Sequence, residues 1–177
     1  GSCHDVQEVN GLPLERPYAE WAAAPAGDEG RPCQTCHMPA SEGTAAEGGP
    51  TRTVHDHRFV GVDVPAGLDE DTANDMQTRV STLLEGSATV LLDLPSDAPA
   101  GGQLDVLVTL RNELDAHNLP TGSTFNRQLW LELLVHDAAG TLVYETGTLD
   151  DNGDLRDHWS ALDPYGDDDL ISLHSDL

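Results

Sequence analysis

Apolar and polar positions alternate over short stretches in the second half of the chain, and this period of two predicts β-strands. The alternation is clearest in residues 104–110 and 129–135. A four-residue turn, Asp137 to Gly140, follows the second stretch and leads to residues 141–145, which predicts a β-hairpin. Two further strand regions are predicted at residues 80–94, broken at Gly86, and at residues 170–173.

Clusters of Gly, Pro and Asp separate these strands, and no helical period lies between them. Short strands with such separators are typical of an antiparallel β-sandwich, here of the immunoglobulin-like type. The sequence therefore predicts a mainly β fold. Aspartate-rich loops are predicted at residues 69–75, 150–157 and 163–169.

The first 60 residues follow a different pattern, with few apolar side chains, among which alanine is the most frequent. One helix is predicted from Pro17 to about Pro25, because proline favours the first helical position. Residues 40–54 are small and polar, which predicts a loop. This segment lacks the apolar area to offset its ordering entropy. We therefore divide the chain into residues 1–60, a linker at 61–78, and a β-domain at 79–177.

One motif in the first segment carries specific chemistry: Cys33-Gln34-Thr35-Cys36-His37. C-x-x-C-H is the attachment signature of c-type haem. The two thiols bind the porphyrin as thioethers, and the histidine becomes the proximal iron ligand. A zinc site of the Cys3His type, using Cys3 and a histidine, stays an alternative. A redox dithiol would need a βαβ setting, whereas prolines flank this motif on both sides.

A second haem site is predicted at the start of the chain. Gly1-Ser2-Cys3-His4 matches C-x-x-C-H without its first cysteine, so Cys3 and His4 are candidate ligands of a truncated site. The alternative is that Gly1-Ser2 is an expression remnant and Cys3 an unpaired thiol. Haem would supply the apolar surface that this segment lacks. The side chains predicted to pack on it are Tyr18, Trp21, Met38 and Phe59, with Arg58 paired to a propionate.

Electron-transfer haem needs a second axial ligand, and two histidines lead the candidates. His57 ranks first because it follows the motif by a loop's length, and His117 ranks second because it lies in a proline-containing turn between strands. The two histidines could serve the two haems in either order. We expect His136, His158 and His174 at the surface. Residues 150–154 with Asp157 suggest a calcium loop, for which a solvated turn is the alternative.

Charge narrows the range of partners. The 177 residues hold 32 acidic and 8 basic side chains, all of the latter arginine, for a net charge of −24. Such a chain repels phosphate, which excludes nucleic-acid binding and favours a redox partner with a basic docking face. No apolar run is long enough to cross a membrane.

Four phrases of the sequence together resemble multihaem c-type cytochromes of bacteria. They are Cys3-His4-Asp5, Tyr18-Ala-Glu-Trp21, Cys33 to Pro39, and His57-Arg-Phe59, and they are followed by His117-Asn-Leu-Pro-Thr-Gly122 and Arg127-Gln-Leu-Trp130. In that family, haem motifs precede a β-rich C-terminal domain.

The resemblance implies an exported protein, periplasmic or extracellular, that transfers single electrons to a partner or to other haem domains of the same parent chain. The export signal would then lie upstream in the parent. Two other functions stay open. One is a haem enzyme with an open distal site that reduces nitrite, hydroxylamine or peroxide, and the other is a structural or adhesive β-domain.

Overall fold

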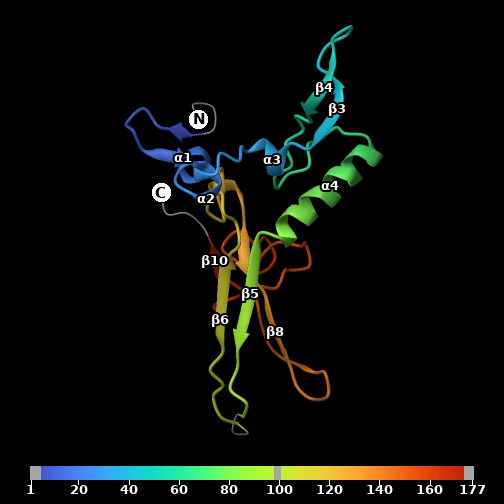
Figure 1. Ribbon diagram of the computed structural model, residues 1–177. Coiled ribbons are helices and arrows are strands. Elements are labelled where there is room, and N and C mark those ends of the chain that lie inside the picture. Colours follow the sequence, from blue (N-terminus) through green and yellow to red (C-terminus); the bar gives the residue numbers. More distant parts are fainter. Residues whose placement is uncertain (1–4, 98–100, 174–177) are drawn as a thin grey trace. The chain divides into compact units, whose positions relative to one another are not determined.

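The computed structural model describes residues 5–97 and 101–173 (Figure 1). Within these ranges the fold is mainly β, and the strands form five two-stranded antiparallel sheets. The paired strands are β1 with β2, β3 with β4, β5 with β6, β7 with β10, and β8 with β9. The prediction of a mainly β, antiparallel protein is confirmed.

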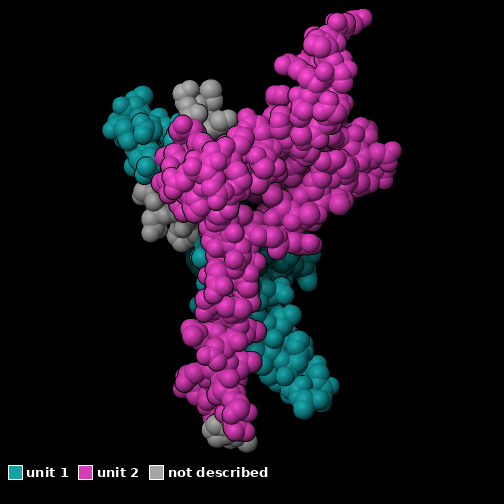
Figure 2. All heavy atoms as spheres, viewed as in Figure 1, with its two compact units in different colours: residues 1–16, 120–177 teal, residues 17–119 magenta. Residues whose placement is uncertain are grey.

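The chain divides into two compact units (Figure 2). Unit 1 comprises residues 1–16 and 120–177, and unit 2 comprises residues 17–119. The motif at Cys33–His37 and the turn around His117 therefore belong to one unit, although about 80 residues separate them.

Unit 2 begins with three short helices. The first helix confirms the prediction at Pro17, although it ends three residues before Pro25. The elements of this unit, in chain order, are α1 (Pro17–Ala22), α2 (Pro25–Asp28), α3 (Gln34–His37), β3 (Ala40–Thr44), β4 (Thr51–His55), α4 (Glu70–Glu85), β5 (Ala88–Asp93) and β6 (Leu107–Asn112). Residues 40–54, expected as a loop, instead form most of the β3–β4 hairpin.

Helix α4 overturns two predictions: residues 69–75 are not a loop, and residues 80–85 are not a strand. Asp69 caps the helix, since its carboxylate accepts the backbone N–H of Thr72 at 3.0 Å. Met76 and Val80, four residues apart, lie buried on one helical face. The burial of these two side chains, which favours a helix, outweighs the short alternation of apolar and polar residues that predicted a strand. The helix begins inside residues 61–78, the segment assigned to a linker.

The core of unit 2 forms around this helix. Met76 and Val80 pack with the buried Val60, and three half-buried side chains complete the cluster: Val64, Leu68 and Leu83. Strand β5 then pairs with β6 over six residue pairs, from Ala88–Asn112 to Asp93–Leu107. The predicted strand at 104–110 therefore begins three residues later and ends two residues later than expected.

Unit 1 contains the remaining strands: β1 (Val6–Gln7), β2 (Pro13–Glu15), β7 (Leu129–Leu131), β8 (Leu133–His136), β9 (Leu142–Thr146) and β10 (Ile171–Leu173), with a short 3-10 helix η1 (Thr124–Asn126). The predicted hairpin is confirmed, since β8 pairs with β9 across the turn from Asp137 to Gly140. The single strand predicted at 129–135 is two strands, because β7 pairs with β10 instead. The aspartate-rich segments 150–157 and 163–169 are loops, as predicted.

Candidate haem site

A single helical turn presents the C-x-x-C-H residues together. The N–H groups of Cys36 and His37 both bond to the carbonyl oxygen of Cys33, at 3.3 and 3.0 Å. Cys33 lies just before α3 and already has helical backbone angles, φ −52° and ψ −33°. Residues three and four apart on a helix share one face. The turn thus places both thiols and the His37 side chain on one side, and both cysteines are free and exposed.

The His37 imidazole is half-buried and held by the backbone of Val60. Its Nδ1 lies 2.5 Å from the carbonyl oxygen of Val60, and the N–H of Val60 donates to the His37 carbonyl at 2.8 Å. A carbonyl can only accept, so Nδ1 carries the proton. The other nitrogen, Nε2, then keeps its lone pair, which is the form that binds a metal ion.

Burial lowers the pKa of His37, the carbonyl of Val60 opposes this shift, and the nearby charge of His117 adds to it. The direction follows from the first cause, because low-polarity surroundings disfavour the charged imidazolium. The neutral ligand form of His37 is therefore favoured at neutral pH.

Phe59 lies flat against the His37 ring. The two ring centroids are 4.6 Å apart and the planes are within 6° of parallel. Phe59 has a φ of 48°, a left-handed conformation that is uncommon for a residue with a side chain. This backbone turn comes just before Val60, so the same short segment supplies the ring that packs on His37 and the carbonyl that orients it.

His117 lies next to His37, with ring centroids 6.1 Å apart and planes inclined by 21°. Its Nδ1 donates to the carbonyl oxygen of Asn118 at 2.9 Å, which leaves Nε2 as the nitrogen not engaged by this bond. The side chain of Asn112 donates to the carbonyl of His117 at 3.0 Å. His117 thus has the same arrangement as His37: one nitrogen bound to the backbone and the other ready to bind a metal ion.

The distance between the His37 and His117 rings can be compared with the distance between two imidazoles that bind the same metal ion. When two imidazoles bind one metal ion on opposite sides with metal–nitrogen distances of about 2 Å, their centroids lie about 6 Å apart. The observed distance of 6.1 Å matches this value. The centroid separation is therefore compatible with two histidines that share one metal ion.

Contacts to the first helices hold the loop that carries His117. The carbonyl of Asp115 accepts the N–H of Ala26 at 2.9 Å, and its carboxylate pairs with Arg31. The N–H of Asn118 donates to the carboxylate of Glu20 at 3.0 Å. These bonds join residues far apart in sequence, and they fix His117 relative to the segment that leads into the motif.

Tyr18 and Trp21, both predicted to contact haem, lie on α1. Their rings are 5.4 Å apart, and the indole N–H of Trp21 donates to the carbonyl of Arg31 at 2.8 Å. Tyr18 is 41% exposed. The structure thus places both rings in the same unit as the motif.

His57 is exposed and is turned back on its own segment. Its Nδ1 bonds to the carbonyl of His55 at 2.9 Å, and the Nδ1 of His55 bonds to the carbonyl of Met38 at 2.8 Å. Within the described part of the chain, the histidine ring in contact with His37 is that of His117. Arg58, expected to bind a propionate, pairs with Asp56 and holds the pKa of that carboxyl at about 2.

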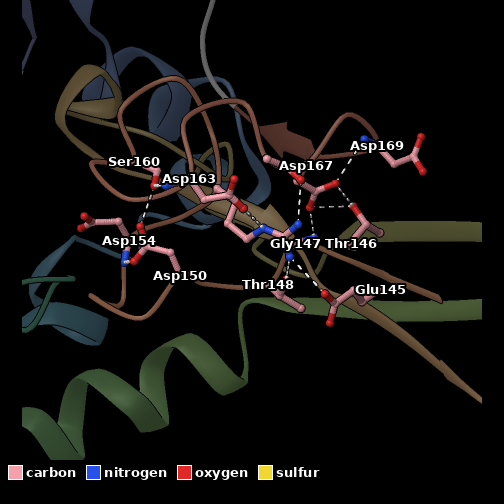
Figure 3. A network of polar contacts seen from close by, with 12 residues as sticks. Glu145, Thr146, Gly147, Thr148, Asp150, Asp154, Ser160, Asp163, Asp167 and Asp169 are labelled. Atoms are coloured by element: carbon pink, nitrogen blue, oxygen red, sulfur yellow. Dashed lines mark hydrogen bonds and ion pairs between the residues drawn. The ribbon is translucent and has the colours of Figure 1, made fainter. Parts of the chain in front are cut away.

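The other histidines and the acidic loop complete the comparison. His136 and His158 are exposed, as predicted, while Cys3, His4 and His174 lie outside the described residues. The carboxylate of Asp150 accepts bonds from Ser160, at 2.6 Å, and from the N–H groups of Asn152 and Asp154 (Figure 3). Asp150 therefore closes a turn.

Two kinds of feature are absent from the described residues. No group of three or more His, Cys, Asp and Glu side chains converges as a metal site in residues 5–97 and 101–173. Over the same ranges, no helix has the length and apolar character needed to cross a bilayer. A haem iron takes only its axial ligands from the protein.

Comparisons with protein-family models, with curated proteins and with solved structures found no match to this chain.

Three contributors to this site were missed by the sequence analysis: the carbonyl of Val60, Glu20 and Asp115. Phe59-Val60 is an ordinary apolar pair, and a backbone carbonyl gives no signal in a sequence. Asp115 is one of 32 acidic residues, and nothing marks it among the rest. Glu20 lies in the Tyr18-Ala-Glu-Trp21 segment, but its sequence position gives no sign that its carboxylate accepts the N–H of Asn118.

Proposed function

We propose that this chain transfers single electrons through a haem c bound covalently to Cys33 and Cys36, with His37 and His117 as the two axial ligands. The contact between His37 and His117 supports this most directly, because the rings lie at the separation that a shared metal ion requires. The exposed thiols on the same helical face as His37 support it further.

When bound, the haem supplies an iron centre that takes up and releases one electron. The protein holds both imidazole rings in a fixed orientation through its own contacts. Val60 and Asn118 bind the Nδ1 protons, and Phe59 limits rotation of the His37 ring. With haem bound, these fixed imidazoles would keep the surroundings of the iron similar in the two redox states. The net charge of −24 favours the ferric state and so lowers the reduction potential.

The assignment of His117 reverses the order in which the sequence ranked the candidates. In this proposal the protein is part of an exported multihaem cytochrome, in the periplasm or outside the cell, and other haem domains or a basic protein exchange electrons with it.

The immunoglobulin-like sandwich is also a proposal. Its support is the exposure of apolar side chains on the two-stranded sheets, such as Val90 at 52% and Leu92 at 54% on β5. Both residues lie on one face, together with their partners on β6, Leu110 and Val108. Stacking a second sheet on such a face would cover it.

The first test is attachment. Produced in cells that carry a haem-attachment system, the full chain should keep haem on a denaturing gel. Replacing Cys33 and Cys36 together by Ala should abolish this haem. If the haem of the unmodified chain is lost in acidified acetone, or if the chain binds zinc in its place, the proposal is wrong.

The second test identifies the ligand. The ferric spectrum should be low-spin, and His117→Ala should make it high-spin and open the iron to added cyanide. The control His136→Ala should stay low-spin, because that side chain is exposed. If His57→Ala gives the high-spin spectrum and His117→Ala does not, the assignment of His117 fails while electron transfer stands. If the unmodified protein is already high-spin, an open-site enzyme is the better conclusion.

A further inference from the structure

One loop of unit 1 displays two large aromatic side chains to solvent. Trp159 is 77% exposed and Tyr165 is 73% exposed. The ring of His158 lies near both, with centroid distances of 4.5 Å to Trp159 and 6.2 Å to Tyr165. We call residues 156–167 the aromatic loop. Tryptophan and tyrosine are usually buried in monomers and enriched where proteins bind partners.

The exposed rings stand on an ordered loop. The carboxylate of Asp157 accepts the N–H of Trp159 at 2.7 Å and the side-chain amide of Gln128 at 3.0 Å. The carbonyl of Asp157 accepts the N–H of Tyr165 at 2.9 Å. One residue therefore positions the backbone at both aromatic side chains. Tyr165 is held there with a φ of 57°, a conformation that large side chains rarely adopt.

A polar network fixes the base of the loop. Arg156 donates to the carboxylate of Asp163 at 2.9 Å and to the carbonyl of Gly166 at 2.6 Å. The N–H of Asp163 donates to the hydroxyl of Ser160 at 2.8 Å, and Ser160 donates to Asp150 (Figure 3). A surface held in place in this way loses little entropy when it binds a partner.

The negative charge around the loop indicates which kind of ligand it favours. Residues 150–169 contain eight aspartates and a single basic residue, Arg156, which is already paired with Asp163 and Glu145. The aspartates are Asp150, Asp151, Asp154, Asp157, Asp163, Asp167, Asp168 and Asp169. Aromatic faces attract cations, and the guanidinium group stacks on them. Both features favour a positively charged ligand.

We propose that the aromatic loop binds an arginine side chain on the surface of a basic partner protein, with Trp159 as the main contact. The carboxylates of residues 150–169 steer the partner and Trp159 stacks on the guanidinium group. This inference stands on residues of unit 1 alone and does not depend on haem. Flat aromatic surfaces also bind sugars, but the charge of eight nearby aspartates attracts a cation over long range and does not attract a neutral sugar in this way.

The test uses the full chain with tryptophan labelled for NMR and a capped tetra-arginine peptide as the probe. The chain has three tryptophans, and the indole N–H groups of Trp21 and Trp130 are bonded to backbone carbonyls at 2.8 Å. Trp159→Phe assigns the third signal. We expect tetra-arginine to shift the Trp159 signal, with weaker binding at high salt, and tetra-glutamate to leave it unchanged.

Matched variants separate the loop from general charge attraction. Trp159→Ala should weaken tetra-arginine binding about two- to fivefold. The control is Phe125→Ala, which removes another exposed ring of unit 1, at 63% exposure, outside the loop; its affinity should equal that of the unmodified chain. Equal affinities of the Trp159 and Phe125 variants would overturn the proposal. A Trp159 shift caused by the neutral sugar maltotetraose but not by tetra-arginine would also overturn it, in favour of carbohydrate binding.

Discussion

Replacing Met76 by Ala tests whether the small core of unit 2 supports the candidate haem site. Met76 is 1% exposed and packs with Val60 and Val80, the other buried members of the cluster. Val60 also supplies the carbonyl that binds Nδ1 of His37. Loss of the Met76 side chain should therefore loosen the backbone that orients the proximal ligand.

The expected magnitude follows from the burial of Met76. Truncating a fully buried methionine to alanine costs about 2–5 kcal/mol, because apolar contacts are lost and a cavity remains. In a unit of this size each kcal/mol lowers the melting temperature by roughly 4–8 °C, so we expect a fall of about 10 °C or more. Few apolar neighbours can refill the space, since in residues 5–97 and 101–173 three half-buried apolar side chains pack against the buried cluster.

Urea unfolding followed by circular dichroism measures this effect. The matched control is Gln77→Ala, at the next, exposed position of α4, which should change the free energy of unfolding by less than about 0.5 kcal/mol. Met76→Leu should restore most of the loss, because it nearly conserves volume. If Met76→Ala and Gln77→Ala unfold at the same urea concentration, Met76 does not belong to a core and the argument fails.

Three further changes test other parts of the structure. Gly27→Ala should destabilise unit 2 by about 1–3 kcal/mol, because the added Cβ would lie 2.2 Å from the carbonyl oxygen of Trp21. Thermal unfolding would measure the loss as a lower melting temperature, and an unchanged melting temperature would contradict the close approach. Asp115→Ala removes the exposed ion pair with Arg31 but keeps the backbone hydrogen bond to Ala26, so the free energy of unfolding should fall by about 1 kcal/mol or less. Cyanide should bind the proposed haem iron faster, because the loop that carries His117 is held less firmly, and a rate equal to that of the unmodified protein would show that the ion pair does not hold His117. The hydrogen bond from the N–H of Thr141 is the main cause that lowers the pKa of Asp137 below its ordinary 3.8, so this carboxylate stabilises the β8–β9 hairpin above that pH and ceases to do so as the pH falls through the lowered pKa. Urea midpoints measured between about pH 6 and pH 2 should therefore fall more steeply for the unmodified chain than for Asp137→Asn, and parallel curves would refute this.

Features that depend on a few neighbouring residues could be predicted from the sequence. The turn from Asp137 to Gly140 specifies the β8–β9 hairpin, because the Asp137 carboxylate accepts two N–H groups within the turn and Gly140 has a φ of 83°. Pro17 begins α1 at the predicted position, and the spacing of Cys33, Cys36 and His37 implies one shared helical face. In each case the chemistry and its partners lie within one turn of the chain.

Features that join distant segments were decided by the tertiary structure. Helix α4 replaced a predicted loop and part of a strand, since Met76 and Val80 gain more from packing on Val60 than from alternation in an isolated strand. The choice of His117 over His57 depended on bonds from Ala26, Arg31 and Glu20 to residues 115–118. The haem prediction therefore came from the sequence by itself, through residues adjacent in the chain. The partner of His37 could come only from the folded structure, because some 80 residues separate the two histidines and nothing local to either one encodes their contact.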